Sequence, residues 1–313
     1  MGLAVLYLEG FALGLAITIL LTILAIARSV CSVSYKDVLG KTVDQSKRGT
    51  ATGLASSIAA GLVIIYALIL SSQMFDKLVL VTIGLFLAGG FWIIASLLFS
   101  TLTEEKGATE GGGNPFKVAQ ENAKYLIQDK QLLLFVITRG LLIATALAPP
   151  FMVTLAAEDF ENGFGGLGWL LLASSAASLL SSYVWGRLAD QSSRKVLLYS
   201  GLFGGLALAA TGVCSNLGLL SYDWLLPILL FGLMVAYQGV RLGRSTHLVD
   251  MADEDKRASY TALSNTVIGV LLLMGSGFSV LASLFGEVLV LYLFSSMCFA
   301  SMISAKLLKE EQQ

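Results

Sequence analysis

The chain has 313 residues, of which 56% are hydrophobic and only 13% are charged, and its mean hydropathy is +0.80. Soluble domains carry about a quarter charged residues. This chain therefore lacks the polar surface that a water-soluble fold of its size requires. The formal net charge of −1 excludes the strongly basic balance typical of nucleic-acid binding. We expect an integral membrane protein whose main partner is the lipid bilayer, with no nucleic-acid partner.

Nine apolar stretches have the length of about 20 residues that a membrane-spanning helix needs. They are residues 5–38, 50–72, 78–100, 132–157, 164–186, 196–215, 222–247, 258–282 and 284–307. Each must be helical in lipid, because its backbone polar groups have no other partners there. The sequence therefore predicts an all-α polytopic membrane protein with about nine transmembrane helices.

The basic residues fix the expected orientation. All lysines and arginines except Arg28, Lys77 and Arg139 lie in alternate connecting segments or in the tail. These segments are residues 36–48, 101–131, 187–195, 241–257 and the tail after 305. Cytoplasmic loops carry an excess of Lys and Arg, so we expect the N-terminus outside, the C-terminus in the cytoplasm, and the cell membrane as the location.

Residues 101–131 divide the chain into two helical parts. The stretch TLTEEKGATEGGGNP at 101–115 is typical of a flexible linker. The apolar residues that follow recur at helical spacing, which predicts a short amphipathic helix at the membrane surface. The expected organisation is a partial N-terminal half over 1–100, a cytoplasmic linker over 101–131 and a complete six-helix half over 132–313.

An internal repeat relates the two parts. KRGTATGLASS at 47–57 and KRASYTALSNT at 256–266 share Lys-Arg and similar residues at a constant offset of 209, and Asp44 matches Asp253 at the same offset. Both stretches end a basic segment and begin an apolar one. Parallel repeats of this kind are a known transporter architecture.

The segment GRLADQSSRK at 186–195 carries a resemblance to a known family. Its residues resemble the G-x-L-A-D-x-x-x-R-K loop signature of the major facilitator superfamily, with Ser193 where that family usually has glycine. The matching residues are Gly186, Leu188, Ala189, Asp190, Arg194 and Lys195. The position after the linker corresponds to the copy between helices 8 and 9. The resemblance implies an N-terminally truncated member with helices 4 to 12, of which three belong to the first half and six to the second.

Asp190 is the residue of this loop that needs a partner. A carboxylate at a membrane interface must be compensated, and a helix N-terminus offers free N–H groups and partial positive charge. The pseudo-symmetry points to the helix start at Gly49, Thr50 and Thr52. We expect Asp190 to contact that N-terminus when the cytoplasmic side is closed, as a reversible conformational latch.

The basic residues of the same loop have two interpretations. Arg187, Arg194 and Lys195 would hold the loop against Asp44 or lipid phosphate. Alternatively, they act only as a positive-inside anchor without a switching role.

Several polar residues within the apolar stretches are candidates for a transport path. Arg28 either faces a cavity or extends to the cytoplasmic surface, and we expect Arg139, nearer a helix end, to extend to that surface. Pro149 and Pro150 should kink or break their helix. Tyr237 and Gln238 are possible solute contacts, although a buried Gln also suits an interhelical hydrogen bond. We expect His247 to be solvated at its helix end.

The sequence gives no indication of an enzyme. No nucleophile–base pair is visible, and LGKTVD at 39–44 and GFGGLG at 163–168 lack the strand context of nucleotide-binding loops. Cys31, Cys214 and Cys298 have no metal-like spacing, so neither a metal nor a cofactor is expected. No acidic residue lies mid-membrane, which leaves the coupling ion open.

The leading interpretation is a secondary transporter that moves a small solute by alternating access, as the family resemblance implies. The alternative is a non-transporting membrane scaffold or receptor that keeps the fold. We also expect that the chain is a fragment, a product of a mis-assigned start or a degenerate copy.

Overall fold

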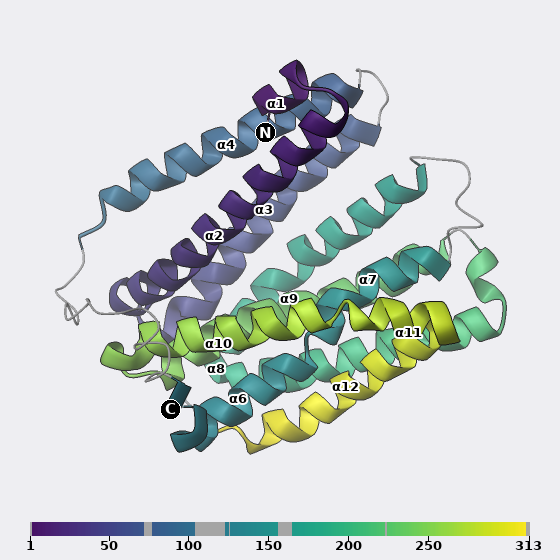
Figure 1. Ribbon diagram of the computed structural model, residues 1–313. Helices are drawn as coiled ribbons and strands as arrows, with labels where there is room; N and C mark the ends of the chain where they lie inside the picture. The colour runs from purple at the N-terminus through teal and green to yellow at the C-terminus, as the bar shows by residue number, and fades with distance from the viewer. Residues whose placement is uncertain are drawn as a thin grey trace.

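The computed structural model describes residues 2–71, 77–103, 123–124, 126–155, 165–222 and 224–310. The described part is helical throughout, with no strand, which confirms the predicted all-α class. Its helices form two groups (Figure 1). The first contains α1 (Gly2–Tyr7), α2 (Gly10–Thr42), α3 (Arg48–Ser71) and α4 (Lys77–Ser100). The second contains α6 (Lys130–Leu141), α7 (Ala144–Leu155), α8 (Gly165–Asn216), α9 (Leu225–Met251), α10 (Glu254–Met274), α11 (Gly277–Phe285) and α12 (Glu287–Leu307). Short 3-10 turns, η1 (Gln45–Lys47) and η2 (Leu219–Ser221), complete the described elements.

The number of membrane crossings agrees with the sequence prediction. Within the described residues, eight helical segments are long and apolar enough to cross a membrane, counting α6–α7 and α10–α11 as one each. One of them, α8, has 52 residues. It is about 78 Å long at 1.5 Å per residue, whereas the hydrocarbon core of a bilayer measures about 30 Å. Helix α8 therefore supplies two crossings, which makes nine.

The prediction of a nine-residue loop over 187–195 was wrong. Helix α8 runs through this segment and departs from helical geometry at Ser192, with φ −165° and ψ 96°. The Ser192 hydroxyl accepts a hydrogen bond from the backbone N–H of Lys195 at 3.1 Å. A serine in this geometry caps the helix that follows. One extended residue with its own cap therefore replaces the expected loop.

Two further crossings are interrupted. Helices α6 and α7 are separated at Leu142–Ile143, and the helix continues through Pro149 and Pro150 to its end at Leu155. The predicted interruption therefore lies before the prolines rather than at them. A proline ring clashes with the carbonyl four residues earlier. For Pro149 and Pro150, the interruption at Leu142–Ile143 lies within about one helical turn of these two carbonyls. Helices α10 and α11 are separated in the same way at Gly275–Ser276.

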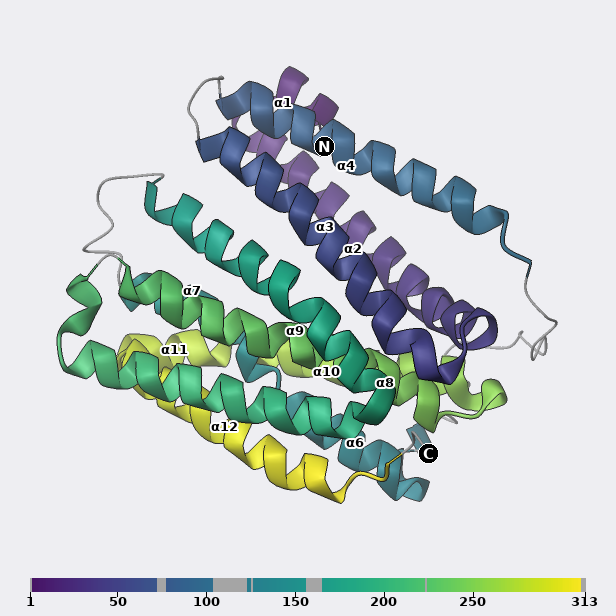
Figure 2. The ribbon, with the colours of Figure 1, turned by 180° about the vertical axis from the view of Figure 1, so that it is seen from behind.

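The two helix groups meet at one end. The helix pairs α2–α3 and α9–α10 follow the repeat, because α2 ends at Thr42 and α9 at Met251, 209 residues later. The groups lie close together at this end and farther apart at the other in both views (Figures 1 and 2). The C-terminus and the basic segments 36–48, 187–195 and 241–257 lie at the end where the groups meet.

The second group contains the packed apolar core. One buried cluster, which includes Met152, Leu208 and Phe294, lies between α7, α8, α9 and α12, and another surrounds Phe135 and Leu197 nearer the basic end. The apolar side chains of α2 and α4 are mostly exposed instead. The predicted linker and its amphipathic helix, residues 101–131, lie largely outside the described residues.

Helix α6 begins at an aspartate cap. Asp129 accepts hydrogen bonds from the backbone N–H groups of Gln131 at 2.9 Å and Leu132 at 3.1 Å, and from the Tyr260 hydroxyl at 2.6 Å. Burial raises the pKa of Asp129, but these hydrogen bonds and the charge of Lys256 lower it by more. The pKa therefore lies below its ordinary value of 3.8.

The lowered pKa gives a testable pH dependence. The ionised carboxylate stabilises the fold above pH 3.8, and this contribution is lost as the pH falls through the lower folded-state pKa. We expect Asp129→Ala to reduce the free energy of unfolding by about 1 kcal/mol at neutral pH and by less in strong acid. Unfolding in mixed detergent micelles measures both values, with Asp129→Asn as the variant that keeps a cap without ionisation. An equal loss at both pH values would contradict the prediction.

Candidate functional site

The closest contact between the two groups joins the start of α3 to the first arm of α8. The backbones touch at three glycines: a Cβ on Gly53 would overlap the Ser182 carbonyl, and one on Gly186 would overlap the Gly49 carbonyl. Only glycine allows such an approach of two helices.

Asp190 caps α3 from the opposite group. Its carboxylate accepts hydrogen bonds from the backbone N–H of Gly49 at 2.6 Å and of Thr50 at 2.8 Å, and from the Thr50 hydroxyl. These are two of the N–H groups that a helix leaves unpaired at its start. The negative charge also suits the positive end of the helix dipole. The structure therefore brings Asp190 together with Gly49, Thr50 and Gly186.

The other residues predicted for this contact lie elsewhere. The Thr52 hydroxyl donates to carbonyls of its own helix, at Arg48 and Gly49. The Arg187 guanidinium lies 5.9 Å from the centre of the Tyr183 ring. Lys195 is exposed.

Arg194 binds the C-terminal segment rather than Asp44, which was one of the two partners, with lipid phosphate, that the sequence suggested. It forms an ion pair with Glu310 at 3.3 Å and donates a hydrogen bond to the Leu308 carbonyl. The Glu310 carboxylate also accepts a hydrogen bond from the Ser192 hydroxyl. The expectation that Arg194 contacts Asp44 was therefore wrong, because the end of α12 lies against the kink of α8.

A buried ion pair makes a second connection between the groups. Arg48 donates to Asp250 of α9 at 2.7 Å, and to the carbonyls of Gly40 at 2.7 Å and Val43 at 2.9 Å. The Asp250 side chain is fully buried. Arg48 therefore caps the end of α2 and ties it to α9. This pair was not predicted from the sequence, although Lys47 and Arg48 were the signal that defined the repeat.

One face of α9 carries Tyr237, Arg241 and Arg244, which are spaced by four and three residues. Arg241 donates a hydrogen bond to the Ser56 hydroxyl of α3 at 2.6 Å, across the two groups. Arg244 interacts electrostatically with Tyr237, Arg241 and Arg28 of α2. Two of the predicted path residues, Arg28 and Tyr237, therefore each lie within electrostatic range of Arg244, which was not among the predicted residues.

Arg139 is buried, so the expectation that it extends to the membrane surface was wrong. Only 6% of the residue is exposed. It donates to the Ser264 hydroxyl at 2.6 Å and the Asn265 side-chain oxygen at 2.9 Å, both on α10. These polar residues of a neighbouring helix accept from the two terminal nitrogens of the guanidinium inside the bundle. The charge of Arg244 acts on Arg139.

His247 is also buried rather than solvated, with 0% exposure. Its Nδ1 lies 2.8 Å from the Ser193 hydroxyl, and its ring packs against Phe135. The expectation of solvation was wrong because the second arm of α8 covers this end of α9. Gln238 is buried as well, and its side-chain oxygen has no hydrogen-bond partner in the part of the chain that the structure describes.

A comparison with protein families agrees with this architecture. The family model described as Major Facilitator Superfamily matches residues 132–313, which is more than half of the chain. The chain belongs to this superfamily. No curated protein matches the chain. The matched residues span the second helix group, including the loop signature at 186–195 on which the sequence resemblance rested.

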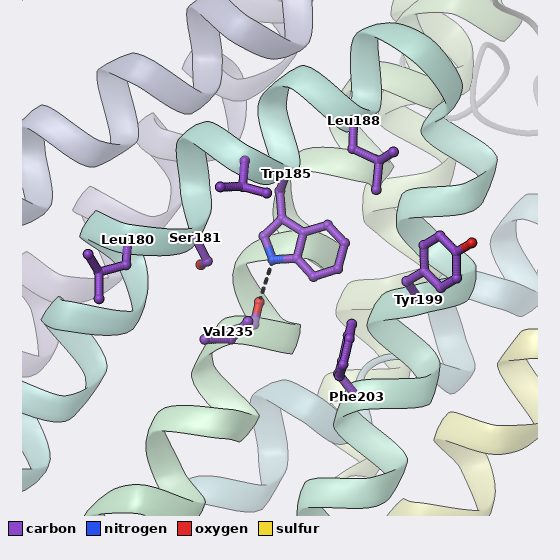
Figure 3. Close-up of a pocket in the computed structure, with 8 residues that line it drawn as sticks. Leu180, Ser181, Trp185, Leu188, Tyr199, Phe203 and Val235 are labelled. Atoms are coloured by element: carbon purple, nitrogen blue, oxygen red, sulfur yellow. Dashed lines mark hydrogen bonds between the residues drawn. The ribbon is translucent and has the colours of Figure 1, made fainter.

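In this superfamily member, an apolar pocket of about 460 Å³ lies between the two arms of α8 and α9 (Figure 3). Trp185 lies among its lining residues and donates its indole N–H to the Val235 carbonyl at 2.9 Å. The Ser181 hydroxyl donates to the Ala177 carbonyl of its own helix. With these groups already bonded, the pocket offers hydrocarbon surface that suits an acyl chain better than a polar solute.

A second pocket, of about 430 Å³, lies between α7 and α11. Its lining includes Pro150, Ser279 and Glu287 together with Gly275 and Ser276, where α10 and α11 separate. It therefore adjoins the interruption of the α10–α11 crossing. Of the two predicted prolines, Pro150 lines this pocket. Among the described residues, no group of three or more His, Cys, Asp or Glu side chains could hold a metal ion.

Proposed function

We propose that the chain works as a secondary transporter, moving a small solute by alternating access between its two helix groups. The observation that carries the proposal is the contact of Asp190 with the start of α3. It joins the groups through backbone hydrogen bonds that need no covalent change to form or break. We further propose the cell membrane as the location, with the basic end of the bundle in the cytoplasm.

Uptake by proteoliposomes tests this function. The purified chain is reconstituted, incubated with a small-molecule extract of the source cells and washed, and mass spectrometry then identifies the solutes inside. We expect one chemical class to accumulate over protein-free vesicles, with saturable uptake that is stimulated by the same solute inside. If no solute accumulates while the chain binds a protein partner, the scaffold or receptor alternative replaces transport.

The latch itself predicts a change of access when Asp190 loses its charge. Asp190→Asn weakens charge-assisted hydrogen bonds, each worth about 1.5–3 kcal/mol. We therefore expect the basic end of the bundle to open about tenfold more often. The measurement is the alkylation rate of a cysteine placed at Ser182, which is buried in the α3–α8 contact. Asp253→Asn is the control, since Asp253 is an exposed carboxylate at the same end. An unchanged rate in Asp190→Asn would remove the latch.

A further inference from the structure

We propose that the solute is an anion that carries carboxylate or phosphate groups and binds between the two helix groups at an arginine cluster. The cluster consists of Arg28 of α2, Arg139 of α6, and Arg241 and Arg244 of α9. The inference rests on the proposed transport function and adds the chemical class of the solute.

The cluster brings together residues that are distant in sequence. Arg241 reaches Ser56 of α3, and Arg139 is fixed by Ser264 and Asn265 of α10. Arg244 is within electrostatic range of the other three guanidinium groups. Five helices from both groups therefore contribute to one basic site.

Among the side chains that the structure describes, no carboxylate forms an ion pair with these four arginines. The ion pairs described there involve Arg48, Arg194 and Lys256 instead. Charged side chains inside a membrane protein are costly unless they have a partner or line an aqueous path. Four like charges in one place raise this cost further, and a bound anion would remove it.

Two buried polar atoms add to the need for a ligand. The Arg139 Nε and the Gln238 side-chain oxygen have no hydrogen-bond partner among the described residues, and both residues are more than nine-tenths buried. Buried polar groups are normally paired. A carboxylate or phosphate oxygen would accept from a guanidinium, and a hydroxyl of the same solute would donate to Gln238.

The position of the cluster allows a solute to reach it. Arg28 and Arg241 are exposed, whereas Arg139 is buried, so the charge extends from an accessible surface into the bundle. Arg244 lies seven residues before the end of α9, about 10 Å along the helix. Arginine binds carboxylate and phosphate with two parallel hydrogen bonds. These features fit an anion better than a neutral sugar or an amine.

Thermal unfolding of the purified full chain in neutral detergent tests the anion site. The probes are inorganic phosphate, succinate and citrate, compared at constant ionic strength with glucose, putrescine and phosphatidylglycerol. We expect a saturable rise of Tm with at least one soluble anion and none with glucose or putrescine. Arg244→Gln should weaken that binding about tenfold to a hundredfold, and Arg28→Gln, at an exposed position, should weaken it without disturbing a buried group. Arg187→Gln, on the exposed surface of α8, is the matched control.

Several results would overturn the anion site. These are stabilisation by glucose or putrescine alone, an effect of anions that is the same in Arg244→Gln and Arg187→Gln, and binding of phosphatidylglycerol without any soluble anion, which would identify a lipid site. The anion site and the proposed transport function can also be refuted independently. Saturable transport of a neutral solute would refute the anion site but not transport. Specific anion binding without flux would refute transport but not the site.

Discussion

Gly53→Ala is expected to hold the two helix groups apart at the basic end. A methyl group on Gly53 overlaps the Ser182 carbonyl and lies within 3.1 Å of Gly186 Cα, and neither is a flexible side chain that could turn away. Overpacking of a tight contact costs about 1–3 kcal/mol. The joined arrangement should therefore lose population by about fivefold to more than a hundredfold relative to the separated one.

Spin labels measure this separation directly. With the three native cysteines replaced, labels at exposed Lys47 and Gln191 report the distance across the contact. We expect a longer distance to dominate in Gly53→Ala. Gly61→Ala is the matched control on the same helix, because a methyl group there would lie 3.9 Å from Leu179, an ordinary contact. If the two variants give the same distances, the glycine crossing does not control closure.

Arg48→Met is expected to destabilise the whole fold. Removing one partner of a buried ion pair costs about 3–5 kcal/mol, because the remaining charge stays desolvated. The variant also loses the hydrogen bonds to the carbonyls of Gly40 and Val43 at the end of α2. Both effects act at the junction of α2 with α9, so the loss should be larger than for any single surface charge.

The control for Arg48 is a charge pair of the same type at the surface. Lys256 lies 3.4 Å from Asp253, and both side chains are largely exposed. Exposed pairs contribute at most about 1 kcal/mol, so Lys256→Met should leave the free energy of unfolding nearly unchanged. Unfolding in mixed detergent micelles compares the two variants. Equal losses would show that the burial of Asp250 has no energetic consequence.

The sequence indicated many residues of the candidate site, but not which of them contact one another. The signature around Asp190 and the repeat around Gly49 predicted a contact that the structure contains. Arg28, Tyr237 and Gln238 were named one by one because a polar residue in an apolar stretch is conspicuous. Arg244 was missed because it lies in a segment that the charge pattern assigned to a loop, whereas α9 extends to Met251.

The amino-acid sequence by itself determined that the chain crosses the membrane as helices, how often it crosses and which ends carry the basic residues. Lipid leaves the backbone no other structure, and hydropathy and charge are local properties. Only the tertiary structure decided whether individual polar groups are buried or exposed. Arg139 and His247 are buried because α10 and the second arm of α8 cover them. Such burial depends on neighbours that are distant in sequence, and so does the gathering of four arginines around one place.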